Sequence, residues 1–177
     1  MTLTGYVAAA PRRLLRSLAT LPGPRDLFEL ALAAGALAAV VGPVGLATGL
    51  LAWRPRPLAE IIPAALSALL APGLGEEAPF RGLLVPDRGE AAAAWGPIVA
   101  STALFCLWHV FEACTFLPGA RPIFLRPDFL AWTVLLGLAC ALLRRRSGSL
   151  WTAVLLHWGL VVLWLGWLGG PSAHSLR

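Results

Sequence analysis

Residues 75–86 read Gly-Glu-Glu-Ala-Pro-Phe-Arg-Gly-Leu-Leu-Val-Pro, and they place two adjacent carboxylates and an Arg inside an otherwise apolar run. A charged side chain at the centre of a bilayer costs roughly 2.5–3.5 kcal/mol even on the mildest insertion scale. On a helix, Glu77 and Arg81 are i,i+4 neighbours that can pair, whereas Glu76 points about 100° away from them. The spacing therefore predicts a structural Glu77–Arg81 ion pair and leaves Glu76 free to face the interior of a helix bundle.

The composition of the 177-residue chain is that of a membrane protein. Hydrophobic residues make up 58% of it and charged residues 13%, and the mean hydropathy is +0.76. All 14 basic residues are Arg, and most stand in short clusters between apolar runs, as juxtamembrane anchors do. This distribution indicates a lipid bilayer as partner and argues against nucleic acid.

Five apolar runs are candidates for membrane spans, namely residues 28–52, 58–85, 97–117, 129–143 and 150–169. We therefore expect an all-α polytopic membrane protein with about five transmembrane helices. The second run carries the charged motif and is interrupted by Pro63, Pro72 and Pro79, which predicts a kinked helix beside a wet pocket. The expected organisation is a basic amphipathic N-terminal segment (1–27), a membrane-embedded core (28–170) and a polar tail (171–177).

The distribution of Arg predicts a multi-pass protein of the cell (inner) membrane with a cytoplasmic N-terminus. On that model eight Arg residues are cytoplasmic (12, 13, 16, 25, 88 and 144–146) and five are not (54, 56, 121, 126 and 177). At about 1.5 Å per residue, Glu76 lies roughly 14 Å, His109 roughly 18 Å and His157 roughly 10 Å from the cytoplasmic ends of their spans. We therefore expect one pocket, reached from the cytoplasmic side.

Two His residues lie deep in apolar runs, His109 in the third and His157 in the fifth. Together with Glu76 they form a set that can hold and activate a water molecule. Phe105 and Glu112 lie about one helical turn from His109 on the same face, so Glu112 is a candidate to orient the ring.

The order of these motifs resembles the CPBP family of intramembrane glutamic-type endopeptidases, which includes the prenyl-protein (CAAX) endopeptidases and the bacterial Abi proteins. The chain has EExxxR at residues 76–81, FxxxH at residues 105–109 and a third motif that begins at His157. The family's last motif usually ends in Asn or Asp, whereas this chain has Val161 in that place. The resemblance implies an intramembrane peptidase that cleaves a membrane-anchored or membrane-proximal peptide or protein.

Two chemistries fit the set of Glu76, His109 and His157. In the first, Glu76 and His109 activate water without a cofactor and His157 stabilises the oxyanion. In the second, the three residues bind Zn²⁺ and leave one position open. The resemblance favours the first chemistry, with Glu77, Arg81, Glu112 and Phe105 in supporting roles. The alternative function is a non-catalytic membrane scaffold or immunity protein, which the departure at Val161 favours.

Overall fold

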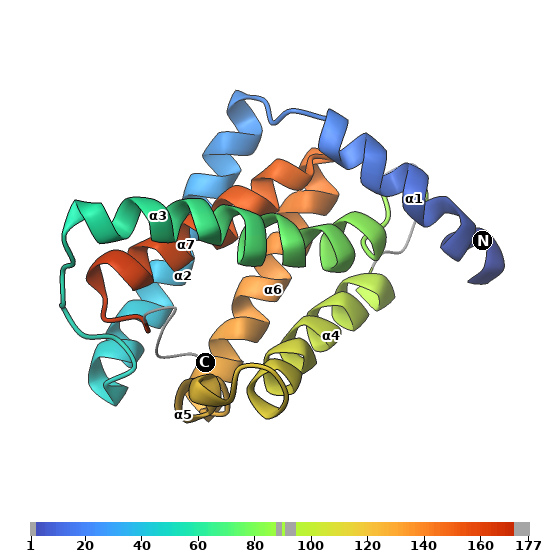
Figure 1. Ribbon diagram of the computed structural model, residues 1–177. Coiled ribbons are helices and arrows are strands. Elements are labelled where there is room, and N and C mark those ends of the chain that lie inside the picture. Colours follow the sequence, from blue (N-terminus) through green and yellow to red (C-terminus); the bar gives the residue numbers. More distant parts are fainter. Residues whose placement is uncertain (1–2, 88–89, 91–94, 172–177) are drawn as a thin grey trace.

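The computed structural model describes residues 3–87, 90 and 95–171, and within these ranges the chain is helical, without a β-strand (Figure 1). The elements in chain order are α1 (Leu3–Ala19), α2 (Pro24–Thr48), α3 (Leu58–Ala68), η1 (Leu69–Glu76), η2 (Ala78–Leu83), α4 (Trp95–Cys114), η3 (Pro118–Ala120), α5 (Arg121–Phe124), α6 (Pro127–Ser147) and α7 (Leu150–Trp167). Five helices of the described chain are long and apolar enough to cross a membrane, which confirms the predicted number of spans. The predicted division into segment, core and tail remains a prediction, and the tail beyond Pro171 lies outside the described residues.

The second span is continuous from Leu58 to Leu83, but its hydrogen bonding changes along its length. After α3, the segments η1 and η2 are π-helical. Pro72 and Pro79 lie inside these segments, and neither residue can donate a backbone hydrogen bond. Wider turns accommodate such losses without ending the helix, and they occur frequently at functional sites. The sequence predicted an irregular, kinked second span. The structure shows a run of wide turns around Glu76 and Glu77.

The spans pack around α6 and α7, which lie in the middle of the bundle (Figure 1). α2 and α4 pack on α6, whereas α3 and η1 pack on α7. One core cluster joins Cys140 and Leu143 of α6 to Ala153 and Leu156 of α7. The outward faces of the spans expose large apolar side chains, such as Leu32 and Leu70, as contact with lipid requires.

The predicted N-terminal amphipathic segment contains a helix, α1, that docks onto the end of the second span. The Arg13 side chain of α1 is fully buried, pairs with Glu90 at 2.6 Å between Nε and Oε2, and donates to the carbonyl of Leu83. A Cβ atom at Gly82 would lie 2.4 Å from Cδ1 of Leu14, so a larger residue in η2 would require the Leu14 side chain to move. Arg13 therefore has a structural role in addition to any part in orienting the chain.

The fourth span is longer than predicted, because the Arg cluster 144–146 belongs to α6 instead of following it. The side chain of Arg144 is fully buried and pairs with Asp87 at 2.6 Å between Nη2 and Oδ1. Arg146 pairs with Glu29 near the start of α2 at the same distance. These two pairs connect α6 to the turn after the second span and to α2, at one end of the bundle. A charged residue with an ion-pair partner can extend an apolar helix, which hydropathy alone does not indicate.

Candidate active site

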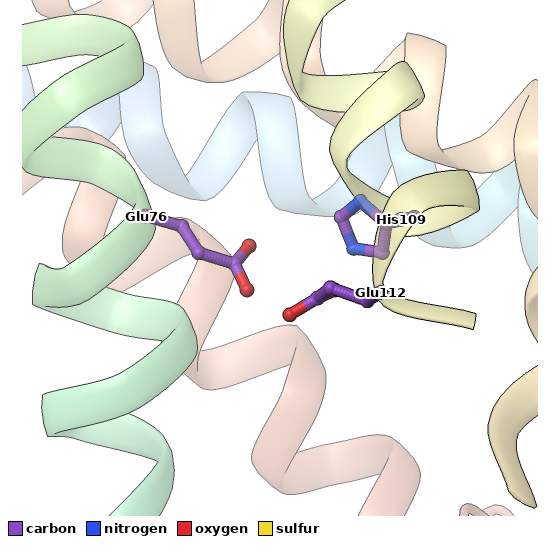
Figure 2. A group of neighbouring side chains, drawn as sticks. All are labelled: Glu76, His109 and Glu112. Atoms are coloured by element: carbon purple, nitrogen blue, oxygen red, sulfur yellow. The ribbon is translucent and has the colours of Figure 1, made fainter. Parts of the chain in front are cut away.

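Glu76, His109 and Glu112 face one another across a gap between η1 and α4 (Figure 2). A donor atom from each of the three side chains lies within 4.8 Å of the others. His109 and Glu112 are buried, with 7% and 8% of their surfaces exposed, and Oε2 of Glu76 is buried without a hydrogen-bond partner. The side chains therefore present two carboxylates and one imidazole to the same small space.

The imidazole of His109 is oriented by its own helix. Its Nδ1 lies 2.9 Å from the backbone carbonyl oxygen of Phe105, one turn earlier. A carbonyl oxygen can only accept, so in the neutral ring Nδ1 carries the proton and Nε2 keeps a free lone pair. The sequence suggested Glu112 for this orienting role, but the Phe105 carbonyl fills it. The carboxylate of Glu112 lies beside that of Glu76 instead (Figure 2).

Glu77 faces a different neighbour from Glu76, as the spacing predicted. Its Oε1 accepts from Nη1 of Arg81 at 3.1 Å, and both side chains are fully buried, which confirms the predicted ion pair. The same Oε1 lies 2.9 Å from Nδ1 of His157 on α7. The sequence did not predict this second contact, because it joins residues 80 positions apart. Glu77 thus positions His157 and neutralises Arg81 at the same time.

Phe105 separates the polar groups of the site. Its ring makes edge contacts with His109, at 4.8 Å between centroids, and with His157, at 5.5 Å. The Arg81 guanidinium lies over its face, 4.0 Å from the centroid, which is a favourable cation–π distance. Behind Arg81, a Cβ atom at Gly137 of α6 would lie 3.1 Å from Nη2. Gly137 is therefore a supporting residue that no motif in the sequence indicated.

The predicted catalytic residues line a single apolar cavity of about 690 Å³. Glu76, His109 and His157 all contribute to its wall, together with Glu112 and Val161. Its size is that of a typical pocket for a small ligand or a peptide segment. Within the cavity the three predicted residues form two groups, since His157 is bonded to Glu77 and His109 lies with Glu76 and Glu112.

The cavity extends toward the end of the bundle opposite α1. At the α1 end the bundle is covered, because Ser149 and Trp151 at the start of α7 donate to backbone carbonyls of Thr20 and Leu18. The cavity wall instead includes residues near the other ends of the spans, namely Leu51, Arg56, Leu117, Phe124, Leu168 and Pro171. The cytoplasmic N-terminus and the access from the cytoplasm both remain predictions. With a cytoplasmic N-terminus, this part of the cavity wall would lie toward the opposite face of the membrane.

A cysteine introduced at Ala64, on the cavity wall in α3, should react with a membrane-impermeant thiol reagent added to the face opposite the N-terminus. The background is a variant in which Cys106, Cys114 and Cys140 are replaced by Ala, with an N-terminal tag that reports orientation. The matched control is Leu66→Cys on the same helix, where the side chain is 64% exposed on the apolar surface. A thiol in lipid ionises poorly and should react slowly. Labelling of Ala64→Cys from the tagged face alone would contradict the direction of the cavity.

Glu76, His109 and Glu112 also form the group of described residues that could hold a divalent cation. Two carboxylate oxygens and an imidazole nitrogen are suitable ligands for zinc. His157, which the sequence placed in the zinc set, is not part of this group, and its Nδ1 lies on Glu77. The geometry thus adds Glu112 as a candidate ligand beside Glu76 and His109, and the zinc-dependent alternative remains a prediction.

These residues lie in a part of the chain that matches a known protein family. A search of curated proteins and a search of solved structures each found no match. A family model described as type II CAAX prenyl endopeptidase Rce1-like matches residues 57–163, more than half of the chain. The match contains Glu76, His109 and His157, and it agrees with the resemblance found in the sequence motifs. The chain therefore belongs to the Rce1-like family, a family of CAAX-type intramembrane proteases.

Proposed function

We propose that the protein is an intramembrane endopeptidase that hydrolyses a peptide bond in a membrane-anchored or membrane-proximal peptide. The observation that carries the proposal is the proximity of Glu76 to His109, whose Nε2 keeps a free lone pair, in an apolar cavity. Both groups are proton acceptors, and a water molecule between them would have an acceptor for each of its protons. Such a water is activated for attack on a peptide carbonyl.

His157 is the proposed stabiliser of the oxyanion. With Nδ1 directed at Glu77, its second nitrogen, Nε2, remains available to the cavity whose wall the residue forms. In the protonated ring both nitrogens donate, so Nε2 can donate to an oxyanion while Glu77 serves as the counter-ion. Val161, one turn later on the cavity wall, supplies no donor, so His157 carries this role without help from that position.

Water activation in this proposal requires no metal ion, because Glu76 and His109 together accept the proton that the attacking water releases. The substrate is expected to come from the membrane, since the cavity is apolar and lies among five spans. Neither the residue preference nor a lipid group on the substrate is part of the proposal.

Glu76→Gln tests the proposal by removing the base while keeping the shape of the side chain. Cleavage of a membrane-anchored peptide reporter by the purified protein in lipid vesicles should fall by about 10²–10⁴-fold, the usual contribution of a general base. The matched control is Glu60→Gln, an exposed carboxylate at the start of the same span, which should cleave at the wild-type rate. A Glu76→Gln protein as active as wild type would leave the non-catalytic scaffold as the better explanation.

A further inference from the structure

Glu112 is a buried carboxylate for which neither the sequence motifs nor the proposed water activation provides a use. The described residues contain no ion pair for Glu112 or for Glu76, and Arg81 is already engaged by Glu77. Both carboxylates instead lie with His109 at the cavity, where their donor atoms are within 4.8 Å of one another (Figure 2). A purely structural carboxylate at this depth would be expected to have an Arg or several hydrogen-bond donors as partners.

Two carboxylates this close in an apolar cavity repel each other when both are ionised. The arrangement is stable when they hold one proton between them, as in other pairs of catalytic carboxylates. Trp108 lines the same cavity, and its buried indole N–H has no hydrogen-bond partner in the described structure. The pair can therefore hold a base and an acid in the same site at the same time.

We propose that Glu112 is a further catalytic residue, the acid that protonates the departing amine. This inference rests on the proposed peptidase function. In the tetrahedral intermediate, the attacking oxygen and the departing nitrogen are bonded to the same carbon. A group that contacts the nitrogen must therefore lie within a few ångströms of the groups that contact the oxygen. Glu112 lies this close to Glu76 and His109.

Each proton in the proposed reaction has a donor and an acceptor. The water oxygen bonds to the peptide carbonyl carbon while one of its protons passes to Glu76. The C–N bond then breaks, and the nitrogen takes a proton from the carboxyl group of Glu112 and leaves as an amine. The proton on Glu76 passes to Glu112, which restores the pair and leaves a carboxylic acid and an amine as the products of one peptide and one water.

The experiment compares two reporters with Glu112→Gln, one with a scissile amide and the other with an aryl ester in its place. An amine needs a proton to leave, whereas a phenolate does not. Glu112→Gln should therefore lose about 10²–10⁴-fold in cleavage of the amide, the usual contribution of a general acid, and less than about tenfold in cleavage of the ester. Glu60→Gln is the matched control, and it should cleave both reporters at the wild-type rate.

A second measurement on the wild type keeps the proposal testable if Glu112→Gln does not fold. Across a series of substituted anilides, the rate of amide cleavage should depend only weakly on the basicity of the departing amine, because Glu112 supplies the proton. Glu112→Asp, which retains an acid, should keep this weak dependence. A steep dependence in the wild type would overturn the proposal.

The outcomes separate this inference from the function on which it rests. Selective loss of amide cleavage supports the acid role of Glu112. Equal losses with both reporters would overturn it and indicate a structural or metal-binding role, and unchanged amide cleavage would overturn it as well. A wild-type protein that cleaves neither reporter would reject the proposed peptidase function itself, and the role of Glu112 with it.

Discussion

Single replacements of Glu76, His109 and His157 are each expected to abolish most of the turnover, and the triple replacement is expected to be hardly slower than any single one. The three side chains line one cavity, and Phe105 contacts the rings of both His residues. Residues that act as a unit in one transition state give strongly non-additive losses. Each single loss should lie at about 10²–10⁴-fold, because each replacement prevents either water activation or oxyanion stabilisation.

The measurement uses Gln at each position and a membrane-anchored reporter, with the folded fraction of each variant determined in detergent. Glu60→Gln again serves as the control for a carboxylate outside the cavity. Losses that multiply, so that the triple variant falls far below every single variant, would show that the residues act independently. Such a result would contradict the prediction that the three residues act together in one transition state. Each residue could then still have a separate role.

Replacement of Arg81 by Met is expected to destabilise the protein by about 3–5 kcal/mol, in addition to any effect on activity. The change leaves the Glu77 carboxylate fully buried with only His157 as a partner. An uncompensated charge is costly to bury, whereas removal of both charges is far less damaging. The double variant Glu77→Gln/Arg81→Met should therefore recover much of the lost stability.

Unfolding in detergent, followed by circular dichroism against denaturant, measures this effect. The matched control is Arg25→Met, which breaks another i,i+4 pair, that of Arg25 with Glu29. Arg25 is 81% exposed, so the loss there should stay below about 1 kcal/mol. A stability loss for Arg81→Met as small as for Arg25→Met would mean that the buried pair does not hold the site together.

The sequence determined those features of this protein that depend on one helix at a time. Runs of apolar residues define the spans because backbone polar groups must be satisfied inside a bilayer, and the number of five is confirmed. The Glu77–Arg81 pair followed from the i,i+4 spacing, since that contact exists on almost any regular helix. The order of the three motifs also indicated the family, as the match over residues 57–163 confirms.

Contacts between helices could not be predicted in this way, because they depend on how each helix is rotated and tilted in the bundle. Wide turns in η1 and η2 alter the phase of the second span, and a phase error of one residue turns a side chain by about 100°. Spacing therefore could not decide which carboxylate His157 contacts, nor that Glu112 lies beside Glu76. It also gave no sign that Gly137 leaves room for Arg81.

The tertiary structure also decided toward which end of the bundle the cavity extends. Depth estimates along separate helices placed Glu76, His109 and His157 at compatible levels, but depth alone carries no information about what covers each end of a bundle. The docking of α1 covers one end through Arg13, and the cavity wall continues to Arg56 and Leu168 at the other. The sequence thus determined which residues enter the membrane and which of them are chemically capable. The packing of the helices alone determined which of these residues meet and toward which end of the bundle their cavity extends.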